Sequence, residues 1–233
     1  MKYKKYFTLS YDDGVEQDKR LIELLKTYSL RCTFNINSSF FGQVHDLTRV
    51  GRQIAHNEIP RDEFAGVYKD HEIATHGVTH PDLTRLDREQ IIGQVAGDRR
   101  TLTELVGYEV TGHAYPGGCF DRRVADCLRD DCGIRYARTV NAHERFVLPD
   151  DLLMWHPTCH HDNGRVFEIL DSFIAAEPTD GDLLFYLWGH SYEFDYGTPG
   201  NTWQHIEQLF EAIAGRRDIV YCTNSEVLDS VKA

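Results

Sequence analysis

The chain has 233 residues, of which 37 are acidic and 25 are basic, so its net charge is −12. This length suits one α/β domain over residues 1–233, and the charge argues against nucleic acid or an anionic membrane as a partner. No apolar run approaches the roughly 20 residues of a membrane span. The mixed start Met1–Lys5 does not resemble a signal peptide, and six scattered cysteines are typical of reduced thiols. The expected location is therefore the cytoplasm.

Strand-like and helical segments alternate along the chain. A strand followed by a helix is typical of βα units around a parallel sheet, either closed as a barrel or doubly wound. The predicted strands are Phe7–Tyr11, Cys32–Ile36, Glu72–Thr75, Gly112–Pro116, Ile134–Arg138, Asp182–Trp188 and Asp218–Cys222. The predicted helices are Val15–Tyr28, Asp87–Val106, Asp121–Cys132, Arg165–Ala176 and Asn201–Gly215, the second of which opens with a capping-box pattern at Thr84–Asp87.

Two motifs carry groups that can bind a metal. Asp12 and Asp13 end the first predicted strand, and His76 and His80 follow the third. On a helical turn, a spacing of four residues puts both imidazole rings on one side. One aspartate and two histidines form the three-ligand set of a catalytic zinc site, with open positions for water and substrate. The other aspartate would lie beside the metal, where a general base is needed.

Polar or turn-forming residues also follow other predicted strands. Pro116–Gly118 ends the fourth strand, Arg138 ends the fifth, and His190 follows the sixth. Each motif alone has a purely structural interpretation, such as a turn, a surface histidine pair or a core histidine. Reactive groups gather at the carboxyl ends of the strands in parallel barrels. The convergence of these motifs therefore favours a catalytic barrel.

The motifs resemble those of the polysaccharide deacetylases, the NodB-homology carbohydrate esterases, over nearly the whole chain. The resemblance implies a distorted (β/α) barrel of seven strands and metal-dependent hydrolysis of an acetamide on a sugar. The family motifs Thr-Phe-Asp-Asp-Gly, His-Ser/Thr-x-x-His, Arg-x-Pro-x-Gly and Leu-x-His align with Ser10–Gly14, His76–His80, Ala114–Gly118 and Trp188–His190.

The same resemblance implies a metal site. Asp13, His76 and His80 would hold one divalent ion, with Zn²⁺ expected and Co²⁺ or Ni²⁺ suited to the same ligands. The ion would polarise the acetyl carbonyl and lower the pKa of a bound water toward about 7.

It also implies roles for catalytic residues. Asp12 would act as the general base, and the backbone N–H of Gly117 would stabilise the oxyanion together with the metal. His190 would protonate the leaving amine, which requires an imidazolium and hence a carboxylate partner. The candidates for that partner are Asp195, Glu193 or another acidic residue that the sequence does not place.

The chain departs from the family pattern in three places. Ala114 stands where the family has an arginine that pairs with the base aspartate, and we hypothesise that Arg138 fills this role from the next strand. The fourth family motif, an Asp-Trp pair after the fifth strand, has no clear match. Trp188 replaces a small leucine, which suggests a differently shaped acyl pocket.

Three further segments have more than one interpretation, and the first of them lies outside the family pattern. Cys159, His160 and His161 could form a second metal site or a substrate clamp, although a polar loop is the favoured interpretation. The aromatic and acidic stretch Gly189–Thr198 could bind sugar rings or simply pack. The long connection Phe40–Tyr68 could cap the site as a lid and restrict substrates to short oligomers.

The sequence therefore predicts a cytosolic, zinc-dependent deacetylase of N-acetylated sugars, acting on small oligosaccharides rather than an insoluble polymer. One alternative is an amidohydrolase of the same superfamily that acts on a non-sugar amide or ureide. The other is a carbohydrate-binding protein that has lost catalysis, an idea prompted by Ala114. The sequence specifies neither the sugar nor the oligomeric state.

Overall fold

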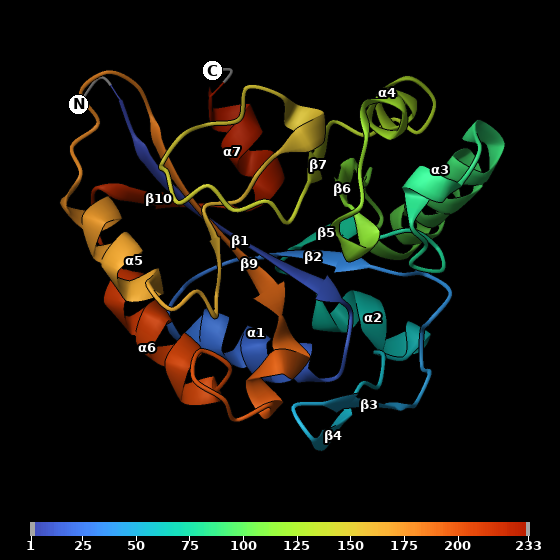
Figure 1. Ribbon diagram of the computed structural model, residues 1–233, viewed down its shortest axis with the longest axis horizontal. Coiled ribbons are helices and arrows are strands. Elements are labelled where there is room, and N and C mark those ends of the chain that lie inside the picture. Colours follow the sequence, from blue (N-terminus) through green and yellow to red (C-terminus); the bar gives the residue numbers. More distant parts are fainter. Residues whose placement is uncertain (1–2, 232–233) are drawn as a thin grey trace.

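The computed structural model describes residues 3–231, which form a central sheet with helices around it (Figure 1). The strands are β1 Lys5–Asp13, β2 Thr33–Ile36, β3 Asp46–Arg49, β4 Arg52–Ala55, β5 Glu72–Thr75, β6 Gly112–Ala114, β7 Tyr136–Arg138, β8 Cys159–His160, β9 Leu183–His190 and β10 Ile219–Tyr221. The helices are α1 Gln17–Thr27, α2 Arg61–Val67, α3 Arg88–Val106, α4 Arg122–Asp130, α5 Val166–Ala175, α6 Trp203–Ile213 and α7 Asn224–Val231. None of these helices combines the length and apolar character needed to cross a membrane.

The central sheet is parallel and curled. Seven strands follow one another in the order β7-β6-β5-β2-β1-β9-β8, and β10 pairs with the first residues of β1. The chain from Trp155 to β8 runs between the two ends of this path. Trp155 forms a parallel bridge with Arg138, and the Thr158 N–H donates to the carbonyl of Tyr186 at 2.9 Å. The prediction of an α/β distorted barrel is thus confirmed.

The longest paired strand, β1, has an apolar outer face, and its inner face is polar from Thr8 to its carboxyl end. Its alternate residues over Phe7–Tyr11 join the main apolar core with α1, α5 and α6, whereas Thr8, Ser10 and Asp12 point the other way. Asn35 on β2 donates from Nδ2 to both Ser10 Oγ and Asp12 Oδ1 at 2.7 Å. Asn35 therefore links the inward-facing polar side chains Ser10 and Asp12, and Asp12 lies at the carboxyl end of this row.

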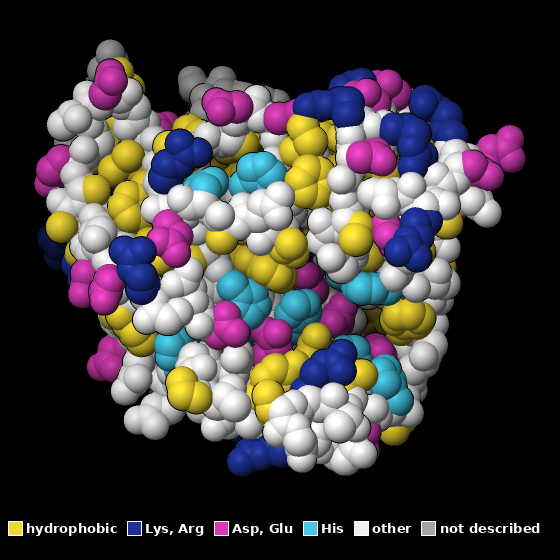
Figure 2. Space-filling view, viewed as in Figure 1, with side chains coloured by type: hydrophobic (Ala, Val, Ile, Leu, Met, Phe, Trp, Pro, Cys, Tyr) yellow, Lys and Arg dark blue, Asp and Glu magenta, His cyan; other side chains and the backbone are white. Residues whose placement is uncertain are grey.

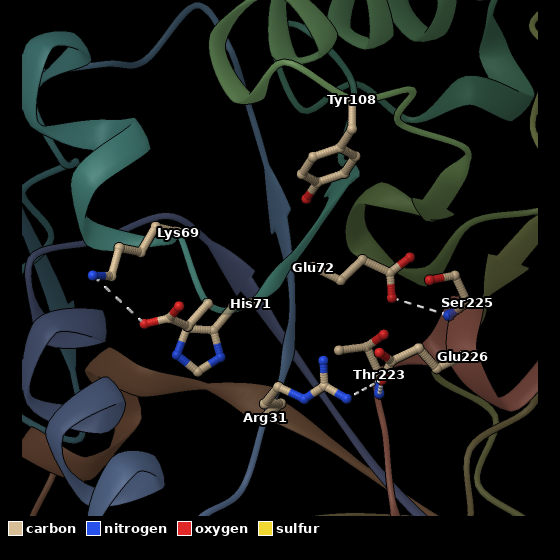
Figure 3. A pocket seen from close by; sticks show the side chains of 9 residues that line it. Arg31, Lys69, His71, Glu72, Tyr108, Thr223, Ser225 and Glu226 are labelled. Carbon is tan, nitrogen blue, oxygen red and sulfur yellow. Dashed lines mark hydrogen bonds and ion pairs between the residues drawn. The ribbon is translucent and has the colours of Figure 1, made fainter.

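The amino ends of the strands are closed by α7. The Ser225 N–H donates to Glu72 Oε2 at 3.0 Å, at the edge of a pocket of about 450 Å³ (Figure 3). Charged side chains around this pocket already pair with one another, as Arg31 does with Glu226 at 2.5 Å. The groups singled out by the sequence motifs lie at the opposite, carboxyl end.

The sequence patterns do not predict β3, β4, β8, α2 or α7. The hairpin β3–β4 turns at Val50 and Gly51, whose φ angles are 46° and 72°. Turns with two positive φ angles usually carry Asn-Gly or another glycine pair. Because Val50 stands at the first of these positions, the sequence does not indicate this turn. The prediction of a capping box at Thr84–Asp87 is wrong. Asp87 is the N-cap of α3 and forms the capping box with Gln90.

Candidate metal and catalytic site

The end of β1 turns two consecutive carboxylates into one pocket. Side chains alternate between the two faces of a regular strand, so Asp12 and Asp13 should point apart. Asp13 instead has a φ of 83°, and Gly14 follows with 74°. Positive φ is an uncommon, strained conformation for a residue other than glycine. This backbone turn brings both carboxylates to the same pocket.

The turn after β5 brings His76 and His80 together. The predicted helical turn is wrong, because Gly77 and His80 have φ angles of 76° and 53° and the segment is not helical. The two rings still meet, with centroids 4.7 Å apart.

A buried carboxyl that the sequence interpretation missed holds this turn in place. Asp98 on α3 accepts from the His76 N–H at 3.0 Å and from the Ser38 N–H at 2.9 Å. Burial raises the pKa of Asp98 to about 7, against the opposing effect of these hydrogen bonds. A sequence feature could have indicated this role, because Asp98 is the one acidic residue on the buried face of α3, with Val95 and Leu102.

Asp13, His76 and His80 fit a divalent metal ion. Asp13 Oδ1 lies 3.7 Å from His76 Nε2 and 3.9 Å from His80 Nε2, and one ligand atom from each residue lies within 4.8 Å of the others. Ligand atoms of a tetrahedral zinc site are about 3.3 Å apart. His76 Nδ1–H donates to the carbonyl of Ala114 at 2.8 Å, which leaves Nε2 as the ligand atom. Burial lowers the pKa of His76 to about 4, so its ring is neutral at pH 7.

Asp12 forms a buried ion pair with Arg138. The guanidinium contacts Asp12 Oδ2, and the two side chains are 1% and 3% exposed. Burial would raise the pKa of Asp12, but Arg138 and the nearby His76 and His190 outweigh it and lower the pKa. Arg138 thus stands beside Asp12 as hypothesised, while its effect on activity stays a prediction.

His190 lies between Asp12 and an acidic partner. Its Nε2 is 3.8 Å from Asp12 Oδ2, and its Nδ1 is 3.3 Å from Glu193 Oε2. Burial would lower the pKa of His190, but Glu193 dominates and raises it to about 9. Of the two candidate partners, Glu193 is therefore the one in place. Asp195 instead accepts from Trp203 Nε1 at 2.8 Å.

The segment around Cys159 is not the loop that the sequence favoured, because its backbone pairs with β9 as strand β8. Cys159 belongs to the main apolar core, so it does not share a site with the two histidines. His160 Nε2 lies 3.1 Å from Glu193 Oε2, and the fully buried His161 stacks on Tyr11 with ring centroids 5.8 Å apart. His161 Nε2 also lies 3.4 Å from Glu193 Oε2, so both rings contact this carboxylate.

The metal-ligand set, Asp12 and His190 surround a pocket of about 440 Å³. Figure 2 shows His, Asp and Glu side chains around a hollow in the middle of the face toward the viewer. Its walls include the sharp turn at Gly117, whose φ is 59°. The Trp188 Nε1 is buried and has no hydrogen-bond partner within residues 3–231. The pocket is lined by Asp12, Asp13, His76, His80, Tyr115, Gly117, Gly118, Val140, Trp188, His190 and Tyr192.

A second hollow, of about 560 Å³, adjoins the first along the β3–β4 hairpin and shares Asp13, His80 and Tyr192 with it. The connection 40–68, predicted as a possible lid, thus forms a side wall of the cleft. In the stretch Gly189–Thr198, Phe194 packs in the core and Tyr192 lines both pockets, while sugar binding by this stretch stays a prediction.

Comparison with known proteins points to one family. The family model described as polysaccharide deacetylase matches residues 2–137. A chitin deacetylase from Pestalotiopsis sp. is 29% identical over 102 residues, which are 43% of this chain and 30% of that protein. The chain therefore spans less than a third of that relative.

Solved structures share the fold over almost the whole chain. The structure described as T48 deacetylase with substrate has a TM-score of 0.60 and 16% identity, covering 98% of this chain and 92% of that one. A CE4 family pseudoenzyme from Bacillus anthracis has a TM-score of 0.56 and 19% identity, covering 97% and 66%. At these identities the likeness shows the fold alone, and the second relative shows that the fold does not guarantee activity.

Proposed function

Because this chain belongs to the polysaccharide deacetylase family, we propose that it is a metal-dependent hydrolase that removes acetyl groups from N-acetylated sugars. One observation carries the proposal: ligands, base and acid for this reaction surround a single pocket. They are the ligand set Asp13, His76 and His80, the ion pair Asp12–Arg138, and the pair His190–Glu193.

Zn²⁺ is the ion we expect, because two imidazoles and a carboxylate suit it, and Co²⁺ or Ni²⁺ would suit the same ligands. When bound, it would polarise the acetyl carbonyl and acidify a water molecule.

Asp12 accepts the proton of the attacking water. Arg138 keeps this carboxylate ionised near neutral pH, and Asn35 fixes its orientation through Oδ1. His190 donates a proton to the leaving amine, because Glu193 holds the ring as an imidazolium up to a pH of about 9. The backbone N–H of Gly117 is the donor we assign to the oxyanion.

Aromatic side chains favour a carbohydrate substrate. Trp188 and Tyr192 line the pocket, and aromatic faces stack on sugar rings. The adjoining hollow offers room for further sugar units of a short oligomer.

Acetate release from N-acetylglucosamine oligomers of one to six units tests the proposal. We expect release by zinc-loaded protein, none after chelation, and recovery when zinc is restored. If metal-loaded protein releases no acetate from any oligomer, deacetylation of these sugars is wrong and another amide or ester is the substrate.

A further inference from the structure

A second group of metal-ligand side chains lies on the β3–β4 hairpin, outside the motifs of the family. His45 directly precedes β3 and His56 directly follows β4, and the His56 N–H donates to the carbonyl of His45 at 2.8 Å. Their rings are therefore neighbours across the hairpin, with centroids 4.8 Å apart. Glu58 follows two residues later and forms an antiparallel bridge with Val15, close to the end of β1.

The three side chains converge on one point. Glu58 Oε1 lies 3.3 Å from His56 Nδ1, and Glu58 Oε2 lies 3.7 Å from His45 Nδ1. One ligand atom from each residue lies within 4.8 Å of the other two. These separations match those of the Asp13, His76 and His80 set, and two histidines with one glutamate are a ligand set of catalytic zinc sites.

Unsatisfied polar atoms at the same place point to a missing ligand. The Glu58 side chain is only 4% exposed, yet neither of its carboxylate oxygens has a hydrogen-bond partner within residues 3–231. The same holds for Nδ1 of His56. The Glu58 carboxylate thus faces His56 and His45 at 3.3 and 3.7 Å without hydrogen-bonding to either ring, and a cation between these atoms would satisfy all three polar atoms.

The other nitrogen of His56 connects this group to the first metal site. His56 Nε2 donates to Asp13 Oδ2 at 3.4 Å, whereas Asp13 Oδ1 faces His76. A histidine that binds metal through one nitrogen generally donates the N–H of the other to a carboxylate, a backbone carbonyl or water. Asp13 is that carboxylate here, and it is itself a ligand of the first site.

We propose that His45, His56 and Glu58 form a second divalent-metal site, joined to the first through the His56–Asp13 hydrogen bond. The residues line the hollow along the hairpin, which also contains His80 and Tyr192. The second ion fixes the hairpin to the barrel and places a positive charge in the cleft wall beside the catalytic pocket. Two imidazoles and one carboxylate select Zn²⁺, Co²⁺ or Ni²⁺.

The test measures bound zinc per chain by elemental analysis after dialysis of apo-protein against excess Zn²⁺, without substrate. We expect two ions in the native protein and one in His45→Ala, Glu58→Gln or His80→Ala. His56→Gln should lose one ion and weaken binding of the other by about 10-fold or more, because Asp13 loses its donor. Asp46→Asn, an exposed carboxylate on β3, makes the same charge change as Glu58→Gln and should keep both ions.

Loss of zinc in His45→Ala cannot be attributed to misfolding, because the His45 side chain is 43% exposed and its removal disturbs little packing. Cobalt substitution gives a second readout, since the visible absorption of the native protein should fall by about half in His45→Ala. One ion in the native protein, with no further loss in His45→Ala or Glu58→Gln, would overturn the proposal. Because no substrate is present, this result is independent of whether the proposed deacetylation occurs.

Discussion

Arg138 lies directly opposite Ala114 in the register of β6 and β7, and its guanidinium reaches Asp12 in a buried ion pair. Positions paired across neighbouring parallel strands project from adjacent points of one barrel wall. The arginine that the family has at the end of β6 is replaced here by Ala114, and Arg138 supplies a positive charge from the end of β7. The chain keeps a positive charge beside the carboxylate that we assign as the base.

Arg138→Ala should reduce kcat/KM by about 10²-fold or more, the range of general-base effects. Arg138 lowers the pKa of Asp12 against the effect of burial, so its loss should raise that pKa and move the acidic limb of the pH–rate profile to higher pH. Arg135→Ala is the control, because Arg135 pairs with Asp229 on the surface. Unchanged activity and an unchanged acidic limb in Arg138→Ala would show that Asp12 does not depend on this ion pair.

Glu193→Gln should move the alkaline limb to lower pH. His190 acts as an acid only when protonated, so activity should fall as the pH rises through about 9 in the native protein. Without the Glu193 charge, burial would lower the pKa of His190. Asp195→Asn removes the other acidic candidate, which bonds Trp203 instead, and should leave the profile as it is. The same alkaline limb in both variants would rule out Glu193 as the partner.

Two adjacent glycines should respond differently to alanine. A Cβ on Gly118 would collide with the Val140 side chain, whereas a Cβ on Gly117 meets nothing within 4 Å. Both have positive φ, so each substitution carries a backbone strain of about 1 kcal/mol. Thermal unfolding should therefore show a larger loss of stability for Gly118→Ala. Equal losses of stability in the two variants would mean that the Val140 side chain moves away from the new Cβ at little cost.

Asp98→Asn should weaken metal binding by about 10-fold to 100-fold while the fold is kept. An amide offers one acceptor oxygen where the carboxylate serves both the His76 and Ser38 N–H groups, so the turn that presents His76 loosens. Asp18→Asn is the matched control. Asp18 is equally buried, and it accepts from Ser191 and Tyr68 rather than from the metal turn. Equal zinc affinity in Asp98→Asn and the native protein would exclude this positioning role.

The sequence predicts the parts of this molecule that have local patterns. The strand-like runs before Asp12, His76 and Arg138 become β1, β5 and β7, because alternation and β-branched content act over a few residues. The carboxyl ends of parallel strands then bring their residues together without further information. The β3–β4 hairpin has no such local pattern, since its turn has Val50 where glycine or asparagine usually stands.

Contacts between distant segments account for the rest. Nothing near Asp98 in the sequence says that it bonds a turn more than 20 residues earlier, although an acid on an apolar helix face was a usable signal. His56 and Glu58 gain their significance only when Glu58 bridges to Val15 and His56 meets Asp13. Glu193 was among the candidates, but only the structure separates it from Asp195.

The most direct measurement of the central claim is acetate release by zinc-loaded native protein and zinc-loaded Asp12→Asn on the same N-acetylglucosamine oligomers. We expect chelator-sensitive release by the native protein and a loss of about 10²-fold or more in the variant, with zinc content and oligomer binding unchanged. Release that is as fast in Asp12→Asn would contradict the role of Asp12. Binding of oligomers without any release by the native protein would mean that this chain recognises acetylated sugars but does not hydrolyse them.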